Sequence, residues 1–237
     1  LKTMFPDARL ARMDQDSTSK KGDTVRLLRS IRNHTVDIVV GTQMLAKGHD
    51  FPNIILVGVI CADLSLNLPD FRAGERTFQV LAQVAGRAGR GNTPGRVVMQ
   101  TYNPEHFIIE AAKRQDYKVL YQNEAPFRKA LKYPPFARMV QLKISGKDAG
   151  KTGNYARRIG QYIKKMISDP RQNKEIQLLG PIEAAIQKVS SRFRWQLLKS
   201  RSSSSLNKLV RSMVDDPDLN PGNQISLTID VDPYSLM

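Results

Sequence analysis

Cysteine is almost absent from this sequence. The 237 residues include one cysteine, Cys61, so the chain alone supports neither a disulfide framework nor a cluster of thiolate ligands for zinc. The histidines His34, His49 and His106 have no metal-ligand spacing, and no metal site is predicted. Long hydrophobic runs are missing too, since the longest, at residues 54–62, is far too short to cross a bilayer. The N-terminal stretch LKTMFPDARLARMDQD carries charge and a proline too early for a signal peptide.

Acidic residues are too few to balance the basic ones. Lysine and arginine number 37 against 22 aspartates and glutamates, a formal net charge of +15. Residues 1–125 hold 17 basic and 13 acidic residues, net +4, whereas residues 126–237 hold 20 and 9, net +11. This balance favours a polyanionic partner, nucleic acid first, held by the second half; a solvated basic surface is the alternative. The same two alternatives apply to four residues of one predicted helix: Arg157, Arg158, Lys164 and Lys165.

The first half alternates apolar runs of strand length with amphipathic segments. Strands are predicted at TVDIVVGT (35–42), IILVGVICAD (54–63) and RVVMQTY (96–102), and helical spacing covers 73–88. The second run is continuously apolar, which is typical of a strand buried on both faces. This alternation predicts an α/β fold with a parallel sheet covered by helices, whose ligands bind at the carboxyl ends of the strands.

The pattern changes at YPPF, residues 133–136, because two consecutive prolines cannot continue the helical stretch predicted at 105–132. The segments predicted after it are, in order, strand 137–144, helix 149–167, strands 175–180 and 192–199, helix 204–214 and strand 224–232. The order β-α-β-β-α-β is that of a smaller, ferredoxin-like α+β domain.

The segment QVAGRAGRG, residues 83–91, combines arginines with glycines. If the preceding helix continues, Gln83, Arg87 and Arg90 lie within about 60° of one another and form one stripe. Arginine fits phosphate with a rigid fork of donors and can neutralise charge that develops on a transferred γ-phosphoryl group. The glycines would let the stripe approach a partner surface closely. An exposed charged face is the alternative, although it would not need both glycines.

A second motif, GTQMLAKGHDFPN, occupies residues 41–53. Thr42 and Gln43 can donate hydrogen bonds to phosphate oxygens. Gly48 permits a turn that a side chain would block, and Asp50 can accept a hydrogen bond from a hydroxyl or a positioned water. Alone, the motif is equally compatible with an ordinary turn of an α/β protein.

Together these two segments resemble motifs V and VI of superfamily 2 helicases. Five further segments are similar in sequence to the PriA family of bacterial replication-restart helicases, also called primosomal protein N′. They are PDFRAGERTF (69–78), VVMQTYNPEH (97–106), LLGP, RFRWQLL and IDVDP. The resemblance runs essentially from end to end.

The resemblance implies three regions: a RecA-like helicase lobe 2 at 1–118, a helical connector at 119–135 and a C-terminal DNA- or partner-binding domain at 136–237. It implies an ATP-dependent 3′-to-5′ DNA helicase that recognises stalled or abandoned replication forks and restarts replication by primosome assembly. ATP and Mg²⁺ are the implied cofactors. The implied location is the bacterial cytoplasm, in association with the nucleoid.

The resemblance also implies residue roles. Arg87 and Arg90 would contact the γ-phosphate, and Gln83 would couple the nucleotide to DNA. Gly48 and Asp50 would face the nucleotide. The residues implied to lie near DNA are Thr42, Gln43 and Lys47.

The segment RFRWQLLK interleaves basic and aromatic residues on a predicted strand. Alternation places Arg192, Arg194 and Gln196 on one face and Phe193 and Trp195 on the other, which we interpret as core. The resemblance implies that the first face binds the acidic tail of single-stranded-DNA-binding protein. Other implied partners are single-stranded and forked DNA, other primosome proteins and the loader of the replicative helicase.

The sequence departs from the family where a nucleotide site would require it. It has no GxxxxGK[ST] loop, no DExH-like acidic box, no cysteine-rich zinc insertion and no N-terminal DNA-binding domain, and it begins with leucine. We expect the C-terminal part of the enzyme, inactive as an ATPase by itself because its arginines lack a phosphate cradle. The alternative is a non-catalytic basic module that binds DNA or protein and retains helicase motifs.

Overall fold

The computed structural model describes residues 1–14, 22–42, 54–86, 88–89, 94–168, 176–189, 192–201 and 203–236. For residues 185–189, 192–201 and 203–205 only the backbone is described. The chain forms two compact units: unit 1 comprises Leu1–Leu68 and Ala73–Tyr121, and unit 2 comprises Pro69–Arg72 and Gln122–Met237.

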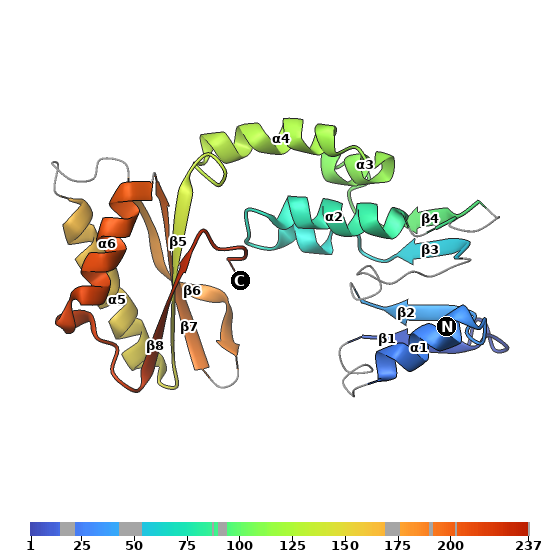
Figure 1. Cartoon of the computed structure of the whole chain (residues 1–237), viewed down its shortest axis with the longest axis horizontal. Helices are drawn as coiled ribbons and strands as arrows, with labels where there is room; N and C mark the ends of the chain where they lie inside the picture. The colour runs from blue at the N-terminus through green and yellow to red at the C-terminus, as the bar shows by residue number, and fades with distance from the viewer. Residues whose placement is uncertain are drawn as a thin grey trace. The chain divides into compact units, whose positions relative to one another are not determined.

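Unit 1 combines short strands with helices (Figure 1). Its elements are β1 (Leu10–Met13), α1 (Asp23–Arg32), β2 (Ile38–Gly41), β3 (Leu56–Val59), the 3-10 helix η2 (Leu64–Asn67), α2 (Ala73–Ala85), β4 (Arg96–Met99), α3 (Phe107–Arg114) and the first part of α4 (Tyr117–Ala130). β1 pairs with β2, and β3 pairs with β4, both in parallel. The predicted α/β class with parallel strands is confirmed, as two small sheets among the described residues.

One face of the β3–β4 pair packs on the helices of unit 1. Val59 and Met99 are register partners and pack against a buried cluster that includes Phe78 and Leu81 of α2. The side chain of Leu56, in contrast, is 61% exposed. The prediction of a strand buried on both faces is therefore wrong for the described part of the chain, because the helices placed there cover one face only.

A small separate core supports β1 and β2. Met13 and Ile31 are its buried members. Beside it, the Arg9 guanidinium donates to both carboxylate oxygens of Asp37, at 2.7 and 2.8 Å, and so links the start of β1 to the residue before β2. These hydrogen bonds from Arg9 hold the pKa of Asp37 well below its usual range.

The helical stretch predicted at 105–132 is two helices instead of one. Gln115 ends α3 with a left-handed φ of 54°, a conformation that an α-helix cannot continue through. Asp116 then accepts a hydrogen bond from the backbone N–H of Val119 at 3.1 Å, in the first turn of α4. The polar residues Gln115 and Asp116 thus separate the two helices.

Unit 2 is a four-stranded antiparallel sheet with two helices on one face (Figure 1). After the end of α4, its elements are β5 (Arg138–Gly146), α5 (Ala149–Ile167), β6 (Gln177–Val189), β7 (Arg192–Arg201), α6 (Ser203–Asp215), the 3-10 helix η3 (Pro217–Leu219) and β8 (Ile225–Val231). The sheet order is β6-β7-β5-β8 and every pair is antiparallel. The predicted ferredoxin-like arrangement is confirmed.

The main core of unit 2 lies between β5 and its two helices. Leu142 and Ile144 of β5 are at most 1% exposed and belong to one cluster with Ile159 and Ile163 of α5 and Leu206 of α6. The i, i+4 spacing along α5 turns its apolar side chains toward the sheet. These bounds of α5 equal the predicted ones.

The opposite face of β5 is covered at one end by the chain that follows β8. Met139 and Gln141 are fully buried, and the Gln141 amide donates to the carbonyl oxygen of Leu236 at 2.8 Å. Toward the other end, Lys143 and Ser145 are only half-buried. This helix-free face therefore becomes more accessible along β5 from Met139 to Ser145.

Candidate nucleotide and nucleic-acid interface

The predicted arginine motif follows directly on α2. Gln83 is exposed in the last turn of α2, which ends at Ala85. Gly89 has a left-handed φ of 78°. The prediction that Gln83, Arg87 and Arg90 share one helical stripe is wrong, because the helix has ended before both arginines. Arg87 and Arg90 themselves lie outside the described residues.

The second glycine of the motif makes a close approach, but to its own chain. The N–H of Gly89 donates to the carbonyl oxygen of Ile54 at 3.0 Å, just before β3. A Cβ on Gly89 would collide with the backbone of Gly95, and a Cβ on Gly95 would collide with the backbone of Gly89. Glycine is required at both positions for the backbones of Gly89 and Gly95 to lie this close together. The structure thus explains Gly89 without invoking a partner surface.

The GTQMLAKGHDFPN motif begins where β1 and β2 end together. Thr42 is exposed, immediately after β2, and its N–H donates to the carbonyl oxygen of Met13 at 3.4 Å. Parallel strands present their carboxyl ends on one edge, which is where α/β folds bind ligands. The remaining predicted residues of this motif, Gln43, Lys47, Gly48 and Asp50, lie outside the described residues.

A carboxylate also holds the carboxyl ends of β3 and β4 together. Asp63 accepts hydrogen bonds from the Thr101 hydroxyl at 2.9 Å and from the Tyr102 N–H at 2.8 Å. Burial acts to raise the pKa of Asp63, but the hydrogen bonds from Tyr102 and Thr101 outweigh it and the pKa is lowered. The Asp63 carboxylate therefore accepts hydrogen bonds from the chain that follows β4, and we assign it a structural role in unit 1.

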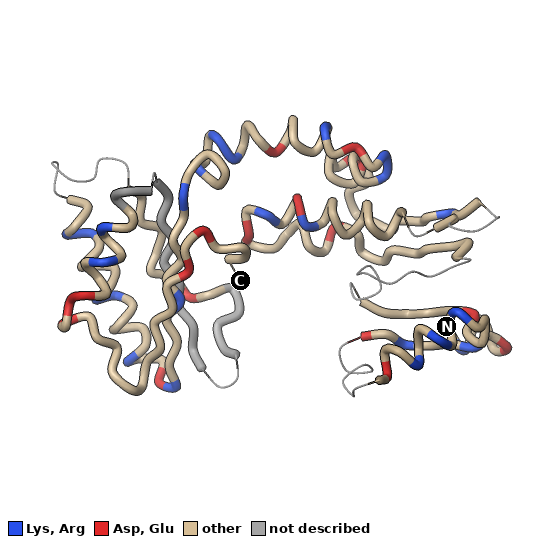
Figure 2. Tube along the Cα trace, in the orientation of Figure 1, with Lys and Arg blue, Asp and Glu red and all other residues tan. Residues whose placement is uncertain are grey.

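Helix α5 carries basic residues and no acidic ones (Figure 2). All the charged residues of α5 are basic, and all are exposed: Lys151, Arg157, Arg158, Lys164 and Lys165. The Arg158 guanidinium lies 5.1 Å from the centre of the Tyr155 ring. Because no acidic residue of α5 neutralises these charges, the helix can attract a phosphate backbone.

The register of β7 places the predicted partner residues. Arg194 pairs with Ser145, and Gln196 with Lys143, which are on the helix-free face of β5. Trp195 pairs with Ile144, on the helix-covered face. Residues opposite each other in antiparallel strands share a face, so the predicted alternation agrees with the register. Arg192 has the same parity as Arg194 and Gln196; the side chains of all three are outside the description.

Lys143 adds a charge to this face that the sequence reasoning missed. Its ammonium group lies 3.5 Å from an Asp230 carboxylate oxygen on β8, in an ion pair with both side chains partly exposed. The signal was present in ARMVQLKI, where alternation already separates Lys143 from its apolar neighbours.

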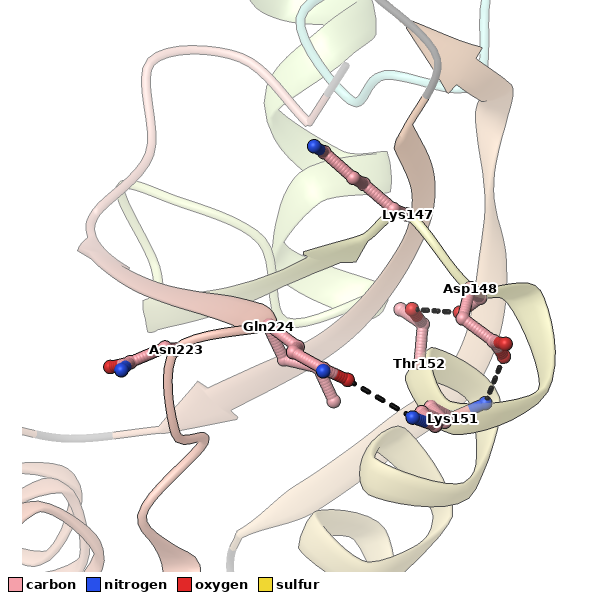
Figure 3. Close-up of a pocket in the computed structure, with 7 residues that line it drawn as sticks. Lys147, Asp148, Lys151, Thr152, Asn223 and Gln224 are labelled. Carbon is pink, nitrogen blue, oxygen red and sulfur yellow. Dashed lines mark hydrogen bonds between the residues drawn. The ribbon is translucent and has the colours of Figure 1, made fainter.

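A cavity of about 390 Å³ opens in unit 2 where α5 begins (Figure 3). Its polar groups are largely paired with one another. Asp148 accepts from the Lys151 N–H at 2.8 Å, and the Lys151 ammonium donates to the Gln224 side chain at 3.1 Å. None of the predicted site residues lines the cavity. Part of its lining is the N-terminus of α5, which Asp148 caps.

The described residues do not by themselves complete a magnesium or zinc site. Among them, no group of three or more histidine, cysteine, aspartate or glutamate side chains could hold a metal ion. Nor does any helix in the described ranges combine the length and hydropathy needed to cross a membrane.

Two protein-family models match separate parts of the chain. The helicase conserved C-terminal domain matches residues 5–92, and the primosomal protein N C-terminal domain matches residues 129–234. The first match contains both predicted helicase motifs, and the second contains the sheet and helices of unit 2.

Curated relatives match over nearly the whole chain. Replication restart protein PriA of Synechocystis sp. is 39% identical over 232 residues, covering 98% of this chain and 27% of the relative. PriA of Bacillus subtilis is 37% identical over 239 residues, covering 100% and 29%. PriA of Haemophilus influenzae is 37% identical over 237 residues, covering 100% and 32%. The chain thus spans less than a third of the length of these relatives, in their C-terminal part.

Proposed function

Because this chain belongs to the family of PriA replication restart proteins, we propose that it supplies the C-terminal part of an ATP-dependent 3′-to-5′ DNA helicase. The whole protein would recognise stalled or abandoned forks and restart replication by primosome assembly, in the cytoplasm and associated with the nucleoid. The predicted membership of the family is confirmed. The observation that carries the proposal is the order of the two family matches, helicase then primosomal, on one chain.

The proposed division of labour follows the predicted regions. Residues 1–118 act as the second helicase lobe, 119–135 connect, and 136–237 bind DNA or a partner. These limits remain predictions. They are supported by the change from short parallel strands to an antiparallel sheet, and by the end of α4 at Ala130.

The proposed catalytic contribution of this chain is positive charge at the γ-phosphate. Arg87 and Arg90 would stabilise the transition state, while Gln83 would couple nucleotide to DNA. The close approach of Gly89 to Gly95 and the hydrogen bond from Gly89 to Ile54 support this proposal, because they hold a residue that lies between the two arginines in the sequence. Preorganised donors stabilise a transition state better than mobile ones do.

The residues of this chain fit only one part of a nucleotide site. Gly48 and Asp50 are proposed to face the nucleotide, and Thr42, Gln43 and Lys47 to lie near DNA. The sequence contains no loop that would cradle the β- and γ-phosphates, and the described residues hold no metal cluster. Bound ATP and Mg²⁺ would supply the phosphoryl group and its counter-charge, and would need the rest of the helicase.

The test compares this chain alone with the same chain in a protein that carries a complete first helicase lobe. We expect no DNA-stimulated ATP hydrolysis by the chain alone. In the complete protein, Arg87→Ala or Arg90→Ala should lower kcat by about a thousandfold or more, as loss of an arginine finger does. Arg96→Ala, in β4, is the matched control and should retain activity. Full activity in both motif variants would favour the non-catalytic alternative.

A second proposal concerns the helix-free face of the sheet in unit 2. We propose that Arg192, Arg194 and Gln196 bind the acidic tail of single-stranded-DNA-binding protein. Lys143 on the neighbouring strand supports this, because its register partner is Gln196 and its ammonium group, paired with Asp230, lies on the same face. Carboxylates of a peptide would then meet several donors at once.

The partner proposal is tested with an acidic C-terminal peptide of single-stranded-DNA-binding protein. Arg194→Ala should weaken its binding by about tenfold, the effect of losing one charge-assisted hydrogen bond. Arg201→Ala is the control, since Arg201 lies on the same strand with the opposite parity. Equal effects of both variants would indicate non-specific attraction to net charge. Primosome proteins and the loader of the replicative helicase are proposed as further partners of the whole protein.

A further inference from the structure

Four residues of the helicase half are built into unit 2. Pro69–Arg72 lie between η2 and α2 in the sequence, yet their contacts assign them to unit 2, whereas the residues on both sides belong to unit 1. The chain therefore leaves unit 1 at Leu68, spends four residues in unit 2 and returns at Ala73 to start α2. We call Asp70–Arg72 the strap.

Asp70 is the buried centre of the strap. It is 9% exposed, and its Oδ2 accepts hydrogen bonds from the Ser235 hydroxyl and the Leu236 N–H, both at 3.1 Å. Its Oδ1 accepts from the N–H of Arg72 at 2.9 Å, which turns the strap back on itself. One carboxylate thus joins the strap to the chain that follows β8.

Phe71 and Arg72 add a stacked arrangement around this carboxylate. The Phe71 ring stacks on Tyr133 with centroids 5.3 Å apart and an interplanar angle of 11°. The Arg72 guanidinium lies 4.9 Å from the centre of the Phe71 ring and 5.4 Å from that of Tyr234. It also donates to the carbonyl oxygen of Pro233 at 3.1 Å. Cation–π contacts and the rigid fork of arginine favour a single geometry here.

The chain after β8 is itself fixed to the sheet. Leu236 is 5% exposed and packs with the fully buried Met139, while its carbonyl oxygen accepts from the Gln141 amide. The N–H of Asp232 donates to the Met139 carbonyl oxygen at 2.7 Å. The strap is therefore held by a segment anchored in the core of unit 2, and not by a loose tail.

No linker separates the strap from α2. Arg72 is hydrogen-bonded within unit 2, and the next residue, Ala73, is the first of α2 and buried in unit 1. α2 has 13 residues and is about 20 Å long, and Gln83 lies in its last turn. One continuous helix therefore joins the strap to Gln83.

We propose that the strap and residues 233–236 form a clasp by which unit 2 fixes the start of α2. A ligand that orders or displaces residues 233–236 would thereby change the stability of the first turn of α2. The clasp stands on the contacts above; that the far end of α2 adjoins nucleotide-binding arginines rests on the proposed function. The clasp is a positioning device and touches no substrate.

Hydrogen exchange in this chain tests the clasp without any ATPase measurement. Asp70→Ala removes the shared acceptor of Ser235 and Leu236. We expect the amide of Leu236 and the first hydrogen-bonded amides of α2, Thr77–Gln79, to exchange about tenfold faster, the effect of losing a buried hydrogen-bonded group. A role of Asp70 confined to unit 2 would accelerate Leu236 alone and would overturn the proposal.

The matched control is Asp63→Ala. Asp63 also accepts from one hydroxyl and one backbone N–H, but all of these groups lie in unit 1. It should accelerate Tyr102 and leave Leu236 unchanged. If Asp70→Ala does not fold, Ser235→Ala removes one donor and should give the same pattern with a smaller acceleration. Unchanged α2 exchange in Ser235→Ala, with Leu236 accelerated, would also contradict the clasp. Because the readout is exchange, the two tests are independent: full ATPase activity of Arg87→Ala and Arg90→Ala in the complete protein would refute the proposed function and leave the clasp standing.

Discussion

Unit 1 builds its two parallel sheets from strands of four residues, whereas the antiparallel sheet of unit 2 has strands of seven to thirteen residues. The central strand β5 is buried on both faces along much of its length, while β3 keeps Leu56 and the adjoining Ile55 and Ile60 exposed among the described residues. The units thus differ in how much of each strand is covered.

This difference in strand burial places the better-packed core in unit 2 and the residues proposed for nucleotide and DNA chemistry in unit 1. The residues proposed to meet ATP and DNA follow the ends of short elements in unit 1, such as Thr42 after β2 and Gly89 after α2. Local unfolding is easiest where few apolar contacts hold a segment. Unit 2 offers a rigid sheet and a basic helix instead, which suits a platform for binding. The following predictions test this contrast, from the largest expected effect to the smallest.

Ile159→Ala should destabilise unit 2 most. Ile159 is fully buried in the core between β5 and α5, and its truncation should cost about 3–4 kcal/mol of unfolding free energy. Trp195 on β7 is the only tryptophan, so its fluorescence in urea reports on unit 2. Leu81→Ala, equally buried in unit 1, is the control and should leave this transition in place. A shared shift would show that the units unfold together.

A pair of glycine substitutions compares the packing of the two sheets. Gly146→Ala should cost about 1–3 kcal/mol, because a Cβ there would collide with the hydroxyl oxygen of the buried Thr152. Gly58→Ala in β3 should be neutral or slightly stabilising, since no described atom lies within 4 Å of its Cβ position. Urea unfolding followed by circular dichroism measures both. Comparable losses at both positions would remove the proposed contrast.

Tyr155→Phe should cost about 1–2 kcal/mol, because the hydroxyl donates to the buried carbonyl oxygen of Leu219 at 2.6 Å. Burial also raises the pKa of Tyr155. Tyr162→Phe is the control: its hydroxyl donates to the carbonyl oxygen of Ser212 at 3.2 Å in a half-buried setting, and its loss should cost about 0.5 kcal/mol. The order of the two Trp195 urea midpoints checks the prediction, and a reversed order contradicts it.

Charge removal from α5 should weaken DNA binding. The double variant Lys164→Ala/Lys165→Ala should reduce the slope of log K against log salt for single-stranded DNA by about 1.4, if both residues meet phosphates. Lys113→Ala/Arg114→Ala removes an equivalent basic pair from the last turn of α3, where both residues already contact Glu110. An unchanged slope in the α5 variant would assign those lysines to solvent.

Acid should weaken unit 1 through Asp37 and Asp63. Their folded-state pKa values are lowered, so each carboxylate contributes stability above its unfolded pKa of about 4, and that contribution is lost as pH falls through the folded pKa. The amide of Tyr102 should therefore exchange faster, relative to its intrinsic rate, as pH falls below about 4. Asp63→Asn should flatten this dependence; an unaltered profile would contradict the assignment to Asp63.

The sequence predicted best those helices and strands whose ends and apolar spacing are set by their own residues. Asp148 caps α5, and the apolar i, i+4 spacing defines its length, so both ends could be read from the sequence. β1 and α1 have no predicted counterpart. The signal of β1 is weak, because it has only four residues, LARM, with a charge among them. α2 ends three residues before its predicted end, since the glycines of AGRAG overrode the continuing apolar period.

The candidate site was less predictable than the fold. The residue types in QVAGRAGRG indicated phosphate chemistry, but a one-dimensional period could not show that Gly89 folds against Gly95. The parity of Arg194 and Gln196 was predictable, because alternation in a strand is strict. Asp70 gave no such signal: its partners, Ser235 and Leu236, lie more than 160 residues away.

The strap makes the boundary between the two units impossible to cut cleanly. A protein dissected at YPPF, or anywhere after Tyr121, would carry the whole antiparallel sheet but leave Asp70–Arg72 on the other piece. Leu236 and Ser235 would then lose the carboxylate that they share, and Tyr133 would lose the ring stacked on it. The C-terminal half thus has the topology of a complete domain, but it is not one continuous segment of chain, because four of its residues, Pro69–Arg72, come from within the helicase sequence.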